Sequence, residues 1–156
     1  HVNLNDNAYL NEQGLIKVLL EFIDANKRYK LIVFLHPLEK KNLEATKNYY
    51  NSLSENIEFA DVNLPNSEQF FNADVAVTLF STLAYERLFW GFKTLIYPLE
   101  KEHFPIKNSI FNSVCTKVEV QLKEKLMTAL EMDAETFFES NGLSNYRYSN
   151  YPVFSN

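Results

Sequence analysis

The stretch LIVFLHP, residues 31–37, decides the fold of this chain, and DVAVTLFST, residues 74–82, repeats its pattern. Each stretch is a short apolar run that ends in polar or turn-forming residues, His36-Pro37 in the first and Ser81-Thr82 in the second. A run that is apolar on both faces is typical of a buried strand in a parallel sheet. The sequence therefore predicts two buried parallel strands with these dipeptides at their carboxyl ends.

Helical patterns alternate with strand patterns along the rest of the chain. The predicted helices cover residues 8–25, 38–53, 83–90, 118–130 and 134–140, and another begins near residues 64–68, with Asn66 or Ser67 as its cap. Further strands are predicted at residues 57–59, 94–97 and 114–116. Strands separated by helices of this length imply right-handed crossovers. The predicted fold class is therefore α/β, a Rossmann-like parallel sheet with helices on both faces.

The composition limits the classes of function. With 156 residues, 46% of them apolar and 22% charged, the chain is expected to form one globular domain over residues 1–144 and a polar, tyrosine-rich tail over residues 145–156. Three glycines argue against a glycine-rich phosphate loop. A net charge of −5 without a basic stripe argues against nucleic acid as a partner.

One cysteine and the hydropathy pattern bear on location. Cys115 excludes an internal disulfide and a cysteine-based zinc site, and it fits a reducing compartment. The three histidines suggest no metal cluster, and we expect no cofactor. No apolar run approaches the ~20 residues that span a bilayer, so no transmembrane segment is expected. The expected location is the cytoplasm, with peripheral association at the inner membrane as an alternative.

The strand ends are the candidate sites, because ligands of doubly wound sheets bind beyond the carboxyl ends of the strands. Ser81-Thr82 joins a strand to a helix, where unpaired backbone N–H groups and the helix dipole favour a phosphate. A plain helix cap is the alternative interpretation. His36 can pair with a phosphate oxygen or protonate a leaving group, and Pro37 restricts its backbone. The alternative is a histidine that satisfies local carbonyl groups.

Two glutamates are candidates for holding a ribose, because a carboxylate can accept two hydrogen bonds from a vicinal diol. Glu86 lies five residues after Ser81, and its alternative role is an exposed residue or an ion pair with Arg87 or Lys93. Glu68 lies in the first turn of a predicted helix, and its alternative role is a favourable interaction with the helix dipole.

Other familiar site motifs do not occur in the sequence. There is no G-x-x-x-x-G-K-[ST] loop, no G-x-G-x-x-G fingerprint and no G-x-S-x-G elbow. Cys115 has no catalytic partners near it in sequence, which weakens a hydrolase interpretation. His103 follows the strand predicted at residues 94–97 and is expected to be solvated rather than catalytic.

The pair FLHP at residues 34–37 and FSTLAYE at residues 80–86 resembles the carboxyl-terminal half of GT-B glycosyltransferases. More narrowly, it is similar to the bacterial sialyltransferases and related enzymes that use CMP-activated sugars. Those families carry a His-Pro motif and a Ser-Ser/Thr motif on the nucleotide-binding lobe. The resemblance covers roughly residues 31–98, and the two motifs lie in the expected order.

The resemblance implies a role for each motif. His36 would contact the CMP phosphate and assist departure of the nucleotide, and Ser81 and Thr82 would hydrogen-bond the same phosphate. Leu64-Pro65 with Glu68 resembles the segment that places a carboxylate on the cytidine ribose. The implied partners are a nucleotide sugar, with a CMP-sugar favoured, and a glycan acceptor.

The sequence departs from that family in one motif, the Asp/Glu-Asp/Glu-Gly triplet that supplies the general base, which does not occur here. A GT-B site also needs two lobes, and this length is enough for one. The chain is therefore expected to be the donor-binding half of a bacterial glycosyltransferase that transfers sialic acid or a related sugar to a surface glycan. The base and the acceptor site would lie on a missing N-terminal lobe or partner chain, and this chain alone would bind nucleotide without turnover.

Three alternatives stay open. The chain could be a stand-alone nucleotide-binding subunit that completes an active site with a partner chain. It could be a non-catalytic interaction domain, or a GT-B lobe for another donor such as a UDP-sugar, CDP-glycerol or CMP-Kdo.

Overall fold

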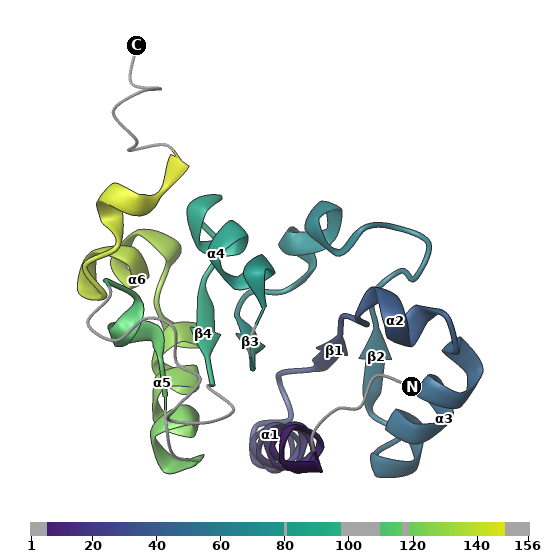
Figure 1. Cartoon of the computed structure of the whole chain (residues 1–156). Helices are drawn as coiled ribbons and strands as arrows, with labels where there is room; N and C mark the ends of the chain where they lie inside the picture. Colours follow the sequence, from purple (N-terminus) through teal and green to yellow (C-terminus); the bar gives the residue numbers. More distant parts are fainter. Residues whose placement is uncertain (1–5, 80, 98–109, 117–118, 149–156) are drawn as a thin grey trace. The chain divides into compact units, whose positions relative to one another are not determined.

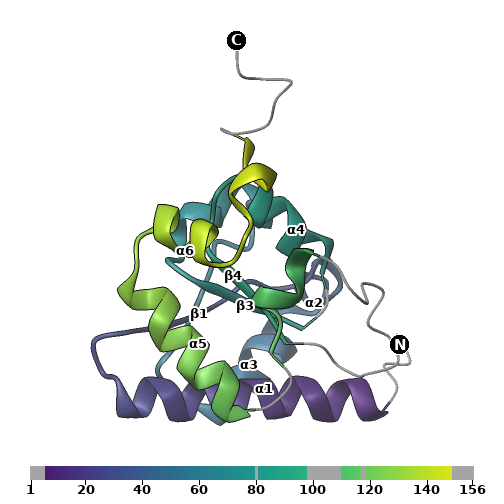
Figure 2. The ribbon, with the colours of Figure 1, turned by 90° about the vertical axis from the view of Figure 1, so that its left-hand side faces the viewer.

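A computed structural model describes residues 6–79, 81–97, 110–116 and 119–148 (Figures 1 and 2). These residues form a mixed α/β structure with two pairs of parallel strands, which confirms the α/β class. The chain divides into two compact units. We call Lys17–Ala73 the β1–β2 unit, and His1–Ile16 with Asp74–Asn156 the β3–β4 unit.

The β1–β2 unit contains a strand–helix–strand crossover. Helix α1 (Asp6–Ala25) leads to β1 (Leu31–Val33), which pairs in parallel with β2 (Ile57–Phe59), Leu31 opposite Ile57. The crossover holds two helices, α2 (Pro37–Lys40) and α3 (Leu43–Leu53). A single helix was predicted over residues 38–53, but Asn42 adopts a non-helical φ of −126° and separates the two.

A short 3₁₀ helix, η1 (Asn66–Asn72), follows β2 where the sequence predicted the start of a helix. Pro65 stands at its N-cap position, and no side chain caps it. The prediction that Asn66 or Ser67 caps this helix is therefore wrong. The Asn66 amide instead donates from Nδ2 to the carbonyl oxygen of Leu35 at 2.9 Å, which ties η1 to the end of β1.

The β3–β4 unit repeats the crossover with one helix. Strand β3 (Ala76–Thr78) pairs in parallel with β4 (Thr94–Ile96), and α4 (Thr82–Phe89) connects them. The chain leaves α4 at Gly91, whose φ of +86° suits glycine at a helix end, as predicted. The strand predicted at residues 114–116 is a single parallel bridge between Cys115 and Ile96, preceded by the 3₁₀ helix η2 (Ile110–Val114).

Two helices close this unit on one side of its strands. Helices α5 (Glu119–Glu131) and α6 (Ala134–Ser140) lie on the same side of β4 in both views (Figures 1 and 2). Their bounds agree with the predicted helices within one residue. Their apolar faces join β4 in a core whose members are nearly inaccessible to solvent, among them Leu88, Leu95, Leu122, Phe137 and Phe138.

The first tail residues pack onto this unit, although their polar composition gave no sign of it. Tyr146, in the 3₁₀ helix η3 (Ser144–Tyr146), donates its hydroxyl to the carbonyl oxygen of Tyr85 at 3.1 Å. Its ring lies edge-on to Phe89 and Phe111. The Tyr148 ring contacts Trp90 with centroids 4.8 Å apart. Residues 149–156 of the predicted tail lie outside the described residues.

Candidate functional site

His36 is exposed and directly precedes α2, three residues after β1 ends. Its imidazole Nδ1 accepts a hydrogen bond from the backbone N–H of Leu38 at 3.2 Å. Pro37 occupies the first helical position, where its missing N–H costs no hydrogen bond. His36 therefore caps its own helix, which is a local role close to the alternative interpretation.

Glu39 completes the cap from the other side. Its Oε2 accepts the backbone N–H of His36 at 2.7 Å, and its Oε1 accepts the Tyr50 hydroxyl at 3.1 Å. Thr46 Oγ1 also donates to the backbone oxygen of Glu39 at 3.2 Å. A glutamate three residues after a capping residue is the capping-box pattern. That pattern was readable in the sequence as His36-Pro37-Leu38-Glu39, and it was missed because the usual capping residue is serine or threonine.

Ser81 precedes α4 in the β3–β4 unit in the same way. It is half-buried, and its Oγ accepts the backbone N–H of Leu83 at 3.2 Å, so it caps the helix as the alternative interpretation predicted. Thr82 is exposed and takes the first helical position. The Ser81 hydroxyl proton has no acceptor within the described ranges, so it can still donate to a ligand.

The two candidate ribose ligands lie in different units. Glu86 is exposed on α4, four residues after Thr82 and therefore on the same face of the helix. Glu68 is exposed on η1, in the unit that holds His36. The structure thus places Ser81, Thr82 and Glu86 together on α4, and His36, Pro37 and Glu68 within the β1–β2 unit.

The cations near α4 serve internal contacts. Arg87 is 5% exposed and donates from Nε to Thr94 Oγ1 at 3.1 Å, and burial lowers the pKa of its guanidinium to about 10. Lys93 Nζ donates to the carbonyl oxygens of Ala129 at 2.6 Å and Met132 at 2.7 Å. Burial lowers the pKa of this ammonium, opposed by nearby acidic groups. Lys93 therefore neutralises the carboxyl end of α5, where the helix dipole favours a cation.

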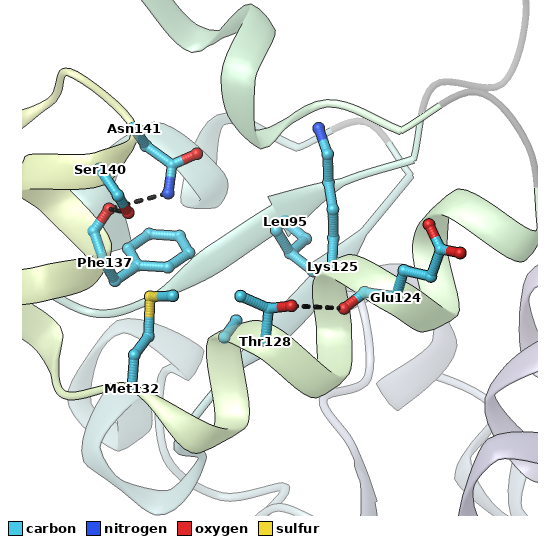
Figure 3. A pocket seen from close by; sticks show the side chains of 9 residues that line it. Leu95, Glu124, Lys125, Thr128, Met132, Phe137, Ser140 and Asn141 are labelled. Carbon is cyan, nitrogen blue, oxygen red and sulfur yellow. Dashed lines mark hydrogen bonds between the residues drawn. The ribbon is translucent and has the colours of Figure 1, made fainter.

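A cavity of about 320 Å³ lies between β4, α5 and α6 (Figure 3). Its polar side chains mostly bond to nearby backbone. Thr128 Oγ1 donates to the carbonyl oxygen of Glu124, and the Asn141 amide and the Ser140 hydroxyl both donate to that of Phe137. Lys125 Nζ donates to the carbonyl oxygens of Ser113 and Cys115. Because these donors are already engaged and none of the predicted site residues lines it, we do not place a ligand in this cavity.

Across residues 6–79, 81–97, 110–116 and 119–148, no three histidine, cysteine, aspartate or glutamate side chains come together as a metal site would require. No helix within the same ranges is long and apolar enough to cross a membrane.

Comparison with known proteins finds no relative: no family model, no curated protein and no solved structure matches the chain.

Proposed function

We propose that this chain binds the donor nucleotide of a glycosyltransferase reaction, with a CMP-sugar as the favoured donor. The observation that supports it is the state of His36. Its side chain is exposed three residues after the parallel strand β1 ends, and its Nδ1 accepts a hydrogen bond from Leu38 N–H. Its Nε2 has no hydrogen-bond partner among the residues that the structure describes. An exposed donor at the carboxyl end of a parallel strand stands where such folds bind phosphate.

In a sugar transfer, the Nε2–H of His36 would stabilise the leaving phosphate. The acceptor oxygen forms a bond to the anomeric carbon, the bond from that carbon to the phosphate oxygen breaks, and its electron pair stays on the phosphate. A hydrogen bond from His36 Nε2 to the phosphate strengthens as this charge develops, which lowers the barrier to departure. The proton of the acceptor hydroxyl goes to a carboxylate, and the Asp/Glu-Asp/Glu-Gly triplet that supplies this base in the enzymes that the chain resembles does not occur here.

Within the β3–β4 unit taken by itself, Ser81 and Thr82 stay predictions as phosphate ligands and Glu86 as a candidate for a ribose, and Glu68 is the ribose candidate of the β1–β2 unit. Ser81 can accept from Leu83 N–H and donate its own proton at the same time, so its capping bond leaves the second role open. Glu68 and Glu86 are both exposed, which leaves their carboxylates accessible to a diol.

Calorimetric titration with CMP, UMP and CDP tests this proposal. We expect CMP to bind most tightly, and we expect His36→Ala to weaken CMP binding about 10- to 150-fold, because a hydrogen bond to a charged group contributes about 1.5–3 kcal/mol. The exposed Glu44→Ala serves as a control with unchanged binding. A chain that binds none of the three nucleotides would overturn the proposal, and tighter binding of UMP or CDP would assign a different donor.

A second candidate, a nucleotide-binding subunit without its own catalysis, is favoured by the missing triplet. It predicts the same CMP affinity but no release of sugar from a CMP-sugar with any acceptor. Release of sugar by this chain alone, at a rate above the uncatalysed hydrolysis, would reject it.

A further inference from the structure

We propose that Glu39 is a positioning residue for His36, fixing the imidazole with its proton on Nε2 so that this nitrogen donates to the nucleotide phosphate. The inference rests on the proposed function for the identity of the ligand. Its structural part, the state of the imidazole, concerns the β1–β2 unit alone and can be measured without any ligand.

The hydrogen bonds around His36 assign the tautomer. Nδ1 accepts from Leu38 N–H, so in the neutral ring the single proton is on Nε2. A ring nitrogen engaged by the backbone sets the role of the other nitrogen. Nε2 is therefore a donor, and because the side chain is exposed and no acceptor for Nε2 lies within the described ranges, this nitrogen is available to a ligand.

The backbone polar groups of His36 and the carbonyl oxygen of Leu35 are also hydrogen-bonded. The N–H of His36 donates to Glu39 Oε2 at 2.7 Å, and its carbonyl oxygen accepts from the N–H groups of Glu39 and Lys40. The carbonyl oxygen of the preceding Leu35 accepts from Asn66 Nδ2. With these atoms held, the position of the Cα–Cβ bond of His36 is defined and the ring keeps few rotamers that reach Leu38 N–H.

Glu39 connects the helix cap at His36 to the buried side chain of Tyr50. Tyr50, 4% exposed, lies edge-on to Phe59 of β2 with ring centroids 5.9 Å apart, and its hydroxyl donates to Glu39 Oε1. The carboxylate thus bridges a buried tyrosine and the N–H of His36 with its two oxygens. A carboxylate suits this bridge because both of its oxygens are acceptors, whereas glutamine offers one oxygen and one NH₂ group.

The first measurement is the tautomer of His36 in the free chain, read from the ¹⁵N shifts of Nδ1 and Nε2. The spectrum is recorded near pH 8.5, about two units above the ordinary histidine pKa, and a His36→Asn spectrum identifies the signals. We expect a population of the Nε2–H form well above that of a free histidine peptide. Glu39→Ala and Tyr50→Phe should move the shifts toward the free-peptide values, Glu39→Gln should move them less, and Glu44→Ala, which removes a first-turn carboxylate of α3, should leave them unchanged.

The second measurement is the affinity for CMP of the same variants. We expect Glu39→Ala to weaken it about 2- to 10-fold, since an ordered side chain that becomes free must be immobilised again on binding. Tyr50→Phe keeps the Glu39 carboxylate and removes only its hydrogen bond from Tyr50. It should therefore reduce the affinity for CMP in the same direction but less than Glu39→Ala, which tests the inference even if Glu39→Ala does not fold.

The two measurements separate the inference from the function on which it rests. A free-peptide tautomer ratio in the wild-type chain, or shifts that Glu39→Ala leaves unchanged, would overturn the positioning role whatever the ligand. An enriched Nε2–H form in a chain that does not bind CMP would reject the proposed function and leave the tautomer assignment standing.

Discussion

Ser81 offers the sharpest separation of a structural role from a binding role, because one hydroxyl is assigned both. Its Oγ accepts Leu83 N–H at 3.2 Å, and replacing a capping serine with alanine costs about 1 kcal/mol of stability. Its proton is proposed to donate to the phosphate, and losing a hydrogen bond to a charged group costs about 1.5–3 kcal/mol of binding. Ser81→Ala should therefore lose both stability and CMP affinity.

Ser81→Asp divides the two effects. Aspartate caps helices about as well as serine, so the free energy of unfolding should stay within about 0.5 kcal/mol of wild type. An aspartate carboxylate has no proton to donate and repels the phosphate, so CMP affinity should fall at least 10-fold. Urea denaturation and calorimetry on the same samples measure both quantities. Wild-type CMP affinity in a stable Ser81→Asp variant would show that Ser81 is a helix cap and nothing more.

Three further predictions concern the β3–β4 unit. Gly91→Ala should lower the free energy of unfolding, measured by urea denaturation, by roughly 1–2 kcal/mol, because φ is +86° there and a Cβ would lie 3.3 Å from Arg147 Nε and Nη2. Gly91→Asn should lower it less, because asparagine tolerates a positive φ better than alanine. Equal losses in the two variants would refute the backbone argument. Lys93→Met should lower the free energy of unfolding by roughly 1 kcal/mol, because it removes two hydrogen bonds at the end of α5. The same change at the exposed Lys27 should leave stability unchanged. A Lys93→Met variant more stable than wild type would show that desolvation of the ammonium outweighs these bonds. The hydrogen bond from the N–H of Thr136 lowers the pKa of Asp133, so this carboxylate adds stability above its unfolded pKa of 3.8, and that stability is lost as pH falls through the lower folded pKa. Asp133→Asn keeps the helix cap and should flatten the decline of the urea midpoint in acid. An unchanged decline in this variant would contradict the assignment.

The strands and most of the helices were predictable because they depend on local patterns. The apolar runs at β1 and β3 and the periodicity of α5 and α6 are properties of a few consecutive residues. The break at Asn42 was not predictable in this way, because residues 38–53 keep a helical pattern through it. The docking of Tyr146 onto Tyr85 was hidden as well, since 61 positions separate the two residues in sequence.

The candidate site was predictable in its residues and less so in its contacts. Placing His36 and Ser81 at helix starts after parallel strands needed only the order of the elements, and the structure has both there. The link from Tyr50 through Glu39 to His36 depends on how α3 packs against β2, which no local pattern encodes. The sequence pattern of a glutamate three residues after a residue able to accept a capping bond, histidine included, would have predicted the contact between Glu39 and His36 but not the one with Tyr50.

The central claim, that His36 recognises the phosphate of a cytidine nucleotide, is tested most directly by one calorimetric comparison. The affinities for CMP and for cytidine, which lacks the phosphate, are measured on the wild-type chain and on His36→Ser, whose serine can still cap α2. The account predicts that wild type prefers CMP and that His36→Ser reduces the ratio of the two affinities about 10- to 150-fold while leaving cytidine binding unchanged. An equal ratio in the two proteins would contradict it.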